Sequence, residues 1–342
     1  MSGSSLDGVD IAYCEFTYDS TWQYHIIVAE TYAYTEEWSI ALASMPDQTG
    51  SKLVEFDLSY GKYLGRLLNV FINKHNLKPE LISSHGHTVF HSPEKGFTFQ
   101  LGNGQSIASS TGIKTISDFR IGDILLGGQG APLVPIGDSL LFAKYDFCIN
   151  IGGIANISFE ADNKRVALDV CPANQLLNHL SRQSGKPYDE NGDIAQLGKM
   201  DKQLFEELNN QSYYSLPYPK SMSNQLVSHT FISIIDSSDS SVQDKLYTVC
   251  KHIAFQINNT ILGFKGDKVL ITGGGAHNKF LITAIQKELM RTIIVPDELI
   301  VDNKEALIFA LMGVLRNEGK VNCLASATGA SRDSSSGVVY FP

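Results

Sequence analysis

The chain has 342 residues, of which 43% are apolar and 18% are charged, and its formal net charge is −9 at pH 7. This length exceeds one ordinary core and predicts two domains, and the composition excludes a largely disordered protein. The acidic balance, without any run of lysine or arginine, argues against nucleic acid or an anionic membrane as the main partner. The acidic charge does not exclude a phosphate ligand, because backbone amides bind phosphate without help from net charge.

The cysteine content and the hydropathy of the chain indicate its cellular compartment. The five cysteines form no Cys-x-x-Cys pair, so the sequence predicts neither a disulfide framework nor a zinc site. No apolar run reaches membrane-spanning length, and no basic-then-apolar leader is present. These features predict a cytoplasmic protein without a membrane partner.

In chain order, the pattern begins with two strands and a long helix. Residues 9–16 alternate, and residues 24–34 are rich in β-branched and aromatic side chains, so both predict strands. Apolar residues at helical spacing between 53 and 77 predict a helix that Pro79 ends. Further helices are predicted over 172–184, 249–263 and 303–316, and loops over 162–165, 232–243 and 331–337. This order of predicted strands and helices indicates an α/β fold with mixed sheets.

A short apolar run ends in small polar or glycine residues three times, in LISSHGHT (81–88), FCINIGGIAN (147–156) and VLITGGGAHN (269–278). Such turns let backbone N–H groups approach a ligand closely. The opening SGSSLDG (2–8) has a similar composition, and its Asp7 could orient a metal-bound water. The pattern indicates a nucleotide site. Taken alone, the opening segment is better explained by a frayed terminus, and NIGGIAN (150–156) is explained equally well by a plain hairpin. Neither the Rossmann fingerprint nor a P-loop is present.

Three charged or titratable groups are candidates for chemistry. Asp169 closes the run VALD before a proline turn, a position that suits a general base, although an N-cap of the following helix is an alternative. Arg120 in SDFRIGD could bind a carboxylate or phosphate, or form an ion pair at a domain boundary. His85, His87 and His91 lack the spacing of metal ligands, so this loop is expected to bind substrate by hydrogen bonds.

Taken together, these segments resemble the anhydro-N-acetylmuramic acid kinases, which belong to the superfamily of sugar kinases, actin and heat-shock chaperone ATPases. The resemblance runs over nearly the whole chain. It is carried, in the family's order, by MSGSSLDGVD, SHGHT, DFRIGDILLGGQGAPLVP, NIGGIANIS, ITGGGAHN and TGASR (328–332).

The resemblance implies an α/β fold of two ribonuclease-H-like domains, each with a mixed five-stranded sheet flanked by helices, and an active site in the interdomain cleft. The N-terminal domain would hold residues 1–118 with part of the tail, about 315–342, and the C-terminal domain residues 119–314. ATP and Mg²⁺ are the implied cofactors, an amino sugar is the substrate, and a homodimer is the implied assembly. The implied reaction opens 1,6-anhydro-N-acetylmuramic acid with water and phosphorylates its 6-oxygen, giving N-acetylmuramic acid 6-phosphate and ADP in peptidoglycan recycling.

The resemblance also implies roles for single residues, with Asp169 as the catalytic base. The expected cofactor-binding residues are Gly3, Ser4, Ser5, Leu6, Asp7, Gly8, Val9, Asp10, Asn150, Gly152, Gly153, Gly273, Gly274, Gly275 and Asn278. The expected substrate-binding residues are His85, His87, Thr88, Arg120, Asp123 and Glu305. The resemblance does not name ligands of a metal.

The chain departs from the family pattern in several places. Relatives carry a strand before Met-Ser-Gly, so the first phosphate turn is expected to lack one arm of its hairpin and residues 1–5 to be poorly ordered without nucleotide. His87 replaces a glutamine, and Cys171, Ala173 and Asn178 replace two glycines and an aspartate. PKSMSNQLV (219–227) loses the Thr-Gly-Arg-Glu that usually follows Pro-Lys-Ser. The alternatives are a related kinase for a different anhydro sugar, a non-catalytic nucleotide-dependent binding protein, and an inactive truncated product.

Overall fold

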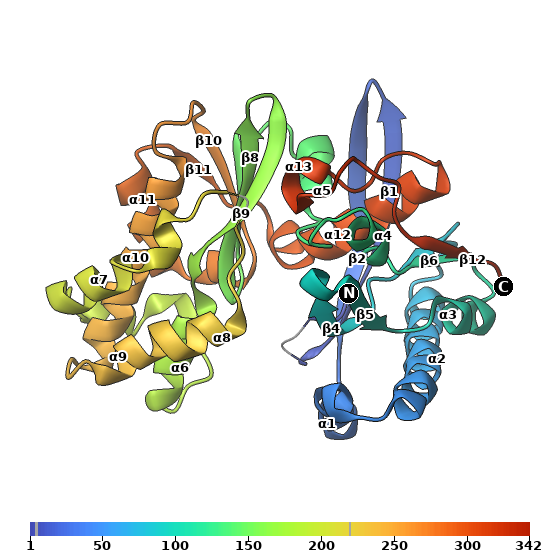
Figure 1. The fold of residues 1–342 in the computed structure, drawn as a ribbon, viewed down its shortest axis with the longest axis horizontal. Coiled ribbons are helices and arrows are strands. Elements are labelled where there is room, and N and C mark those ends of the chain that lie inside the picture. The colour runs from blue at the N-terminus through green and yellow to red at the C-terminus, as the bar shows by residue number, and fades with distance from the viewer. Residues whose placement is uncertain (4–5, 219) are drawn as a thin grey trace. The chain divides into compact units, whose positions relative to one another are not determined.

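A computed structural model describes residues 1–3, 6–218 and 220–342, and the chain divides into two compact units. Unit 1 combines Met1–Leu141 with Asn303–Pro342, and unit 2 is Phe142–Asp302 (Figure 1). These boundaries differ from the predicted ones at 118/119 and near 315. Residues after 118 belong to unit 1 because the side chain of Asp123 binds those of Cys323 and Thr328.

Unit 1 contains three separate sheets in the described residues. Its strands are β1 (Gly8–Asp19), β2 (Thr21–Ala33), β3 (Ile82–Ser83), β4 (His87–Ser92), β5 (Phe97–Leu101), β6 (Thr115–Ser117) and β12 (Val338–Tyr340). β1 and β2 form a long antiparallel hairpin, β4 and β5 form a second one, and β12, β6 and β3 form a three-stranded sheet in that order. The predicted five-stranded sheet is therefore wrong for this unit, because β1 and β3 are not paired with each other.

The helices of unit 1 pack on these sheets. They are α1 (Glu36–Ser44), α2 (Gly50–Lys74), α3 (Gly104–Thr111), α4 (Ile121–Leu125), α5 (Pro135–Leu141), α12 (Glu298–Asn317) and α13 (Ala325–Thr328), with short 3₁₀ turns η1 (Met45–Asp47) and η2 (Pro93–Lys95). α2 buries one apolar face, and its Leu64 and Phe71 share a core cluster with Val9 and Ile11 of β1. The helix predicted over 53–77 is thus confirmed, and it anchors the first strand.

Unit 2 contains the predicted mixed five-stranded sheet. The strands are β7 (Phe147–Ile151), β8 (Ile154–Ala161), β9 (Lys164–Pro172), β10 (Lys268–Thr272) and β11 (Thr292–Ile294), in the order β11-β10-β7-β8-β9. β11, β10 and β7 are parallel, whereas β8 is antiparallel to both of its neighbours. The tight turn between β7 and β8 permits the antiparallel pairing, because a hairpin needs only a short connection.

The helical segments of unit 2 are α6 (Asn174–Gln183), α7 (Lys202–Asn209), α8 (Asn224–Leu226), α9 (Ser233–Ser237), α10 (Val242–Ile261) and α11 (Lys279–Leu289). Shorter ones are η3 (Glu190–Gly192), η4 (Ala195–Leu197), η5 (Ser212–Ser215), η6 (Val227–Ile232, a π-helix) and η7 (Gly274–His277). The loop predicted over 232–243 is wrong in part, because α9 and the first residues of α10 lie there.

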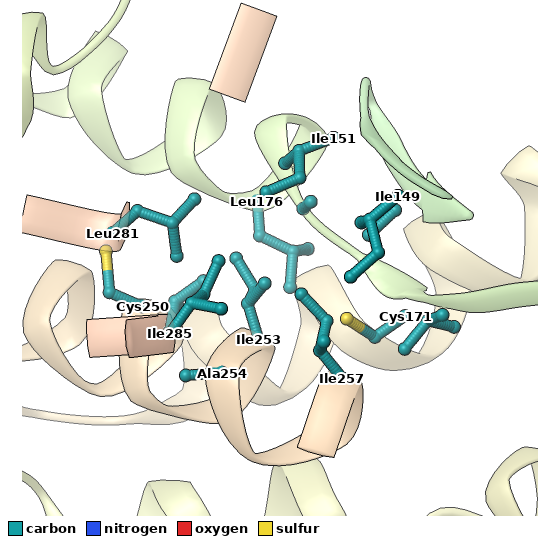
Figure 2. Close-up of a cluster of buried hydrophobic side chains, with 14 of the residues drawn as sticks. Ile149, Ile151, Cys171, Leu176, Cys250, Ile253, Ala254, Ile257, Leu281 and Ile285 are labelled. Atoms are coloured by element: carbon teal, nitrogen blue, oxygen red, sulfur yellow. The ribbon is translucent and has the colours of Figure 1, made fainter. Parts of the chain in front are cut away.

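The core of unit 2 holds β7 against three helices, as Figure 2 shows. Ile149 and Ile151 of β7, Leu176 of α6, Ile253 of α10 and Ile285 of α11 are each 0% exposed. Each such side chain contributes about 1.5–3 kcal/mol when it is fully buried. Since side chains alternate along a strand, burying Ile149 and Ile151 leaves Asn150 between them on the other face of the sheet.

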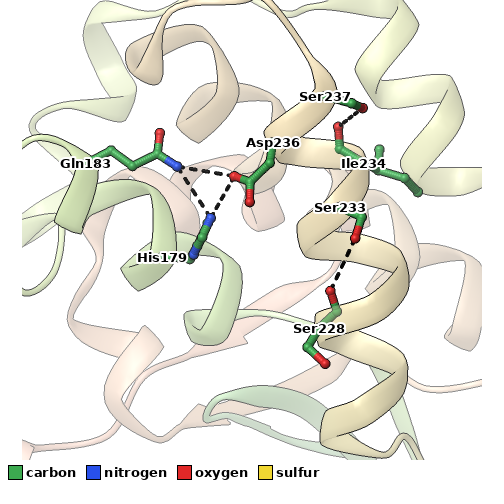
Figure 3. A network of polar contacts seen from close by, with 7 residues as sticks. All are labelled: His179, Gln183, Ser228, Ser233, Ile234, Asp236 and Ser237. Atoms are coloured by element: carbon green, nitrogen blue, oxygen red, sulfur yellow. Dashed lines mark hydrogen bonds and ion pairs between the residues drawn. The ribbon is translucent and has the colours of Figure 1, made fainter.

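Polar contacts on the surface of unit 2 join α6 to α9 (Figure 3). His179 Nε2 lies 2.8 Å from Asp236 Oδ1, and Gln183 Nε2 donates to the same oxygen at 3.3 Å. The hydroxyl of Ser237 donates to the Ile234 carbonyl at 2.8 Å within α9. Exposed pairs of this kind contribute little to stability, so the buried core is what holds α6 in place.

A buried ion pair links α5 to α12 in unit 1. Lys304 Nζ lies 2.7 Å from Asp138 Oδ1, and both side chains are 4% exposed. We predict that Lys304→Met lowers the free energy of unfolding by about 3–5 kcal/mol, because it leaves the carboxylate buried without its counter-charge. Urea denaturation measures the change. The double variant Lys304→Met/Asp138→Leu should recover most of the loss, and a double variant as unstable as the single one would contradict this account.

Candidate active site

The predicted site residues fall into two groups, one in each unit. Unit 2 carries the predicted base and the two glycine turns that follow β7 and β10, whereas unit 1 carries the opening segment, the SHGHT loop and the Arg120 loop. Ser4 and Ser5, two of the predicted cofactor contacts, lie outside the described residues. The residues of each group all come from one unit.

A row of polar side chains crosses three strands of unit 2. Asn150 of β7 lies opposite Asn156 of β8, which lies opposite Asp169 of β9. Residues directly opposite in a sheet have Cβ atoms about 4.5–5.5 Å apart, so the amides line up beside the carboxylate. All three side chains are half-buried. Sequence reasoning missed Asn156, although the hairpin register of NIGGIAN places it opposite Asn150.

Asp169 lies at an irregularity of β9, not at the end of the strand. β9 continues to Pro172, and Val170 is inserted between the pairs Ala155–Cys171 and Asn156–Asp169. The expectation that VALD closes the strand is therefore wrong. Bulges of this kind re-aim a side chain and are frequent beside active sites.

Asp169 is half-buried, and its carboxyl and main-chain groups are hydrogen-bonded to residues 213–222. Its Oδ2 accepts a hydrogen bond of 2.8 Å from the Met222 N–H. The Tyr213 hydroxyl donates to the main-chain oxygen of Asp169 at 2.7 Å, and the Asp169 N–H donates to the Lys220 carbonyl at 3.0 Å. Burial raises the pKa of Asp169, and the Met222 N–H opposes that rise. A raised pKa makes the carboxylate a stronger base.

The Gly152–Gly153 turn is attached to the start of α6. The Gly153 carbonyl accepts hydrogen bonds from Ala173 and Gln175 at 2.9 and 3.1 Å, and the Gly152 carbonyl accepts from Asn174 at 3.1 Å. These carbonyls cap α6, so the alternative in which Asp169 is the N-cap is wrong. They also accept hydrogen bonds from the first N–H groups of α6, so those groups are already paired. An anion at this place would therefore be bound by the Gly152–Gly153 turn itself.

The second glycine turn packs closely on β7. Gly273 has φ 83°, and a Cβ there would lie 2.5 Å from Asn150 Oδ1. A Cβ on Gly275 would lie 2.2 Å from Ile151 Cγ2, whereas one on Gly274 would meet only Asn174 Nδ2 at 3.6 Å. Gly273 and Gly275 are therefore needed for packing, and Gly274 leaves open space beside the backbone.

Asn278 ends this turn and begins a helix. Its Oδ1 accepts a hydrogen bond of 2.9 Å from the Leu281 N–H, which makes it the N-cap of α11, and the residue is 8% exposed. An Asn N-cap contributes about 1 kcal/mol. The structure thus gives Asn278 a helix-capping function, and its predicted contact with a cofactor stays a prediction.

In unit 1, the guanidinium of Arg120 is held from two sides. Nε donates to His85 Nε2 at 2.9 Å, and Nη1 donates to the Gly130 carbonyl at 2.8 Å. His85 Nδ1 lies 2.9 Å from the Gly86 carbonyl, so a neutral ring that donates from Nδ1 and accepts at Nε2 satisfies both contacts. Desolvation, with the charge of Arg120, holds the pKa of His85 well below its usual range.

Asp123 is buried at 1% exposure and binds three donors. Gly130 N–H donates to Oδ2 at 2.8 Å, and Oδ1 accepts from the Thr328 hydroxyl at 2.7 Å and the Cys323 thiol at 3.2 Å. These contacts join the GGQGAP loop to α13. Because Gly130 in turn accepts from Arg120, Asp123 is placed to position that loop and not to contact a ligand directly.

The opening residues bind to β1 and to the SHGHT loop. The Met1 ammonium donates to the Asp10 carbonyl at 2.7 Å, and the Asp10 N–H donates to the Met1 carbonyl at 2.9 Å. Ser2 Oγ lies 3.1 Å from His87 Nδ1, and both residues are buried. His87 therefore holds the opening segment in place. The resemblance to the kinase family implied a contact between His87 and the substrate, but not this contact with Ser2.

The other predicted contacts near this segment differ in exposure. Gly3 and Asp7 are exposed, Leu6 and Thr88 are half-buried, and Val9 belongs to the core. A Cβ on Gly8 would lie 2.6 Å from the Tyr32 carbonyl. Gly8 is thus required for the pairing with β2, and of this group Gly3 and Asp7 have the most open surface.

Glu305 lies on α12 near the Arg120 guanidinium. Desolvation raises the pKa of Glu305, and the charges of Arg120, Lys304 and the Met1 ammonium oppose that rise. The side chain nevertheless keeps contact with solvent. A carboxylate and a guanidinium at one place can bind a polar ligand that carries both hydroxyl groups and a negative charge.

Two of the residues that depart from the family pattern are in the core. Cys171 and Ala173 are both 0% exposed, and Figure 2 shows Cys171 among the apolar side chains. Their side chains therefore do not line a pocket, and the argument that they change the sugar specificity loses its support. Asn178 is half-buried on α6.

Metal ligands and membrane spans were both sought in the described part of the chain. There, no three or more His, Cys, Asp or Glu side chains form a group able to hold a metal ion. No helix in residues 1–3, 6–218 and 220–342 is long and apolar enough to cross a bilayer.

Comparison with known proteins decides the family. The family described as "Anhydro-N-acetylmuramic acid kinase" matches residues 1–342. The chain belongs to the anhydro-N-acetylmuramic acid kinase family. The relative from Aliivibrio fischeri is 35% identical over 360 residues, which cover 99% of this chain and 97% of that protein. Those from Haemophilus influenzae and Vibrio cholerae are 31% and 32% identical and are covered to 96% and 97%.

Likeness to solved structures is weaker. The activator of the 2-hydroxyisocaproyl-CoA dehydratase from Clostridium difficile with bound ADPNP is 15% identical, with a TM-score of 0.41, over 91% of this chain and 98% of that chain. A score of this size carries no argument about function. Membership of the anhydro-N-acetylmuramic acid kinase family, in contrast, makes the chain a kinase that uses a nucleotide.

The two neighbouring glycines after β10 give a matched test in this family member. We predict that Gly275→Ala lowers the free energy of unfolding by about 1–3 kcal/mol, because its methyl group overlaps Ile151. Gly274→Ala should leave the melting temperature unchanged and weaken ADP binding, since only the open space is filled. Thermal unfolding and calorimetric titration of ADP measure the two effects. Equal melting temperatures for the two variants would contradict the packing assigned to Gly275.

Proposed function

We propose that this chain uses ATP and one water molecule to open 1,6-anhydro-N-acetylmuramic acid and to phosphorylate its 6-oxygen in peptidoglycan recycling. The products would be N-acetylmuramic acid 6-phosphate and ADP. Family membership supports the class of reaction. The observation that carries the mechanism is the half-buried carboxylate of Asp169, held at a bulge and in line with Asn150 and Asn156.

Asp169 acts as the general base in this proposal. Met222 holds Oδ2, and Oδ1 takes a proton from water while the water oxygen bonds to C1 of the sugar. The bond between C1 and O6 breaks and leaves its electron pair on O6. O6 then bonds to the γ-phosphorus as the bond to the leaving ADP breaks, and the proton on Asp169 passes to solvent. Asn150 and Asn156 are placed to orient the water beside the base.

The nucleotide would be bound by backbone groups of the two glycine turns and by the opening segment. The open space at Gly274 fits a ligand that lies close to the main chain, and the rigid Gly152–Gly153 turn suits a phosphate. Magnesium, when bound, neutralises charge on the phosphates, and it is usually held by one or two carboxylates together with those phosphates. Exposed Asp7 is the carboxylate proposed for this contact.

The sugar would be bound by the Arg120 group. Neutral His85 and the Gly130 carbonyl fix the guanidinium, and its Nη2 has no hydrogen-bond partner in the described residues. A fixed guanidinium suits the lactyl carboxylate of the substrate. Glu305 would accept hydrogen bonds from its hydroxyl groups, and His87 and Thr88 at the start of β4 are the other proposed contacts. Asp123 positions the loop.

Features that the family resemblance implies belong to the same proposal. They are the ribonuclease-H-like character of the two domains, joint action of the two groups of residues in an interdomain cleft, a homodimer, and a cytoplasmic location. Retention of Asp169 and Glu305 supports a catalytic protein over a nucleotide-dependent binding protein, since binding alone does not require a base.

The assignment of the base is tested by Asp169→Asn. We expect the rate of ADP release with the anhydro sugar to fall at least about 100-fold, because the variant cannot take a proton from water. The dissociation constant for ATP should stay unchanged, as calorimetry can show. Asp162→Asn, in the exposed turn between β8 and β9, is the matched control and should keep normal turnover. Near-normal turnover of Asp169→Asn would rule out this base.

The pH dependence of turnover follows from the raised pKa of Asp169. Burial disfavours the charged carboxylate, so the proton binds at a higher pH than the usual 3.8, and the base is lost earlier on acidification. We predict that kcat/KM falls on the acid side with a midpoint above 3.8. Steady-state rates between pH 4 and 8, with melting temperatures recorded at each pH, measure this. A flat profile down to the pH at which the protein unfolds would contradict it.

A further inference from the structure

A groove on the surface of unit 2 lies between α7 and α10. The two helices pack side by side (Figure 1), and the groove between them has a volume of about 810 Å³, a size typical of small-molecule sites. Its walls come from α7 and the residue after it, from Tyr214 in η5, and from the second half of α10. None of the lining residues belongs to the groups proposed to bind the nucleotide or the anhydro sugar.

One wall of the groove is acidic. Leu204 and Leu208 bury one face of α7 in the core of unit 2, whereas Glu206, Glu207 and Asn210 are exposed and line the groove. Residues three or four positions apart are neighbours on a helix surface, so the Asn210 amide lies next to both carboxylates. This wall therefore offers two negative charges and an amide to a ligand.

The floor of the groove is held in place by buried His252. Its Nδ1 lies 2.8 Å from Asn209 Oδ1, and since an amide oxygen only accepts hydrogen bonds, the proton is on Nδ1. Nε2 then accepts a hydrogen bond of 3.0 Å from the Tyr214 hydroxyl. Burial lowers the pKa of His252 to about 3, so the neutral ring adds no positive charge. Asn209 and Tyr214 are thus fixed before a ligand arrives, which lowers the entropic cost of binding.

Gln256 places an amide oxygen without a partner in the same groove. The residue is 5% exposed, and its Nε2 donates to Asn209 Oδ1 at 2.7 Å. Its Oε1 has no hydrogen-bond partner in the described part of the chain. Buried polar atoms are nearly always hydrogen-bonded, and Gln256 lines the groove. A hydroxyl group of a bound ligand would supply the missing donor.

Aromatic rings complete the lining, and basic side chains do not contribute to it. The ring centroids of Phe205 and Phe255 are 5.5 Å apart in an edge-to-face arrangement, and both half-buried residues line the groove. Within the described residues, no lysine or arginine lines it. The like charge of the two carboxylates opposes an anion, which excludes sugar phosphates and the lactyl carboxylate of the substrate proposed above.

We propose that this groove is a binding site for a small amino sugar with a free ammonium group. The ammonium group pairs with Glu206 and Glu207, and the sugar hydroxyls hydrogen-bond to the amides of Asn209 and Gln256. The apolar C–H face of the sugar ring packs on Phe205. The groove requires a cation, several hydroxyl groups and one apolar face in a single small molecule, and an amino sugar carries all three. This assignment does not rest on the proposed reaction.

The test is calorimetric titration of the full chain, without nucleotide, with glucosamine, glucose and glucose 6-phosphate. We expect glucosamine to bind saturably and glucose to bind at least about tenfold more weakly, the effect of one lost charge-assisted hydrogen bond. Glucose 6-phosphate should not bind measurably, because its charge has the wrong sign. Melting temperatures should follow the same order, since a ligand of the folded state raises them.

Substitutions at exposed positions show where the sugar binds. Glu206→Gln should weaken glucosamine binding about tenfold, and Asn259→Phe on α10 should abolish it by filling the groove. Glu190→Gln in η3 removes the same charge outside the groove and should preserve binding. The proposal is overturned if glucosamine does not bind, or if glucose 6-phosphate binds as tightly. It is also overturned if both groove variants bind glucosamine normally, because the sugar would then occupy another part of the chain.

Discussion

The alternation of side chains along β7 is the constraint on which the chemistry of unit 2 depends. Ile149 and Ile151 are locked into a core shared with three helices, so Asn150 is held on the opposite face. The register of the β7–β8–β9 sheet then carries that placement across two strands to Asp169. A shift of one residue in this register would turn every polar group of the row into the core. The position of the Asp169 carboxylate is thus set by the packing of the core beneath the sheet.

In unit 1 the candidate residues are positioned in another way, by loops that buried polar groups hold in place. The Asp123 carboxylate binds a main-chain donor from the first segment of unit 1 and side-chain donors from the second, and the loop it fixes holds Arg120. A network of this kind stabilises only when it is fully satisfied. Its members are thus coupled, and a change at Cys323 or Thr328 is expected to reach the guanidinium although neither residue contacts it.

The sequence pattern predicted the long helix α2, the first two strands and the glycine turns, because periodicity and turn residues are local signals. The five-stranded sheet of unit 2 was predicted from the family resemblance alone. The pattern did not reveal Asn156, because that residue joins the site only through strand register. It misjudged the end of β9, because a bulge leaves no mark in composition. The sheet of unit 1 was predicted as continuous, and the gap between β1 and β3 depends on contacts between distant segments. Asp123 was predicted as a ligand contact, because burial is not visible in a motif.

The division of the chain has a consequence for the order in which the protein forms. Unit 2 is one continuous stretch, whereas unit 1 is made of both ends of the polypeptide. The hydrogen bond between Asp123 and Thr328 spans 205 residues, and loop closure over such distances is slow. During synthesis, which proceeds from the N-terminus, unit 2 is complete while the first 141 residues still lack α12 and the tail. Unit 1 is therefore completed only when residues 303–342 have been synthesised.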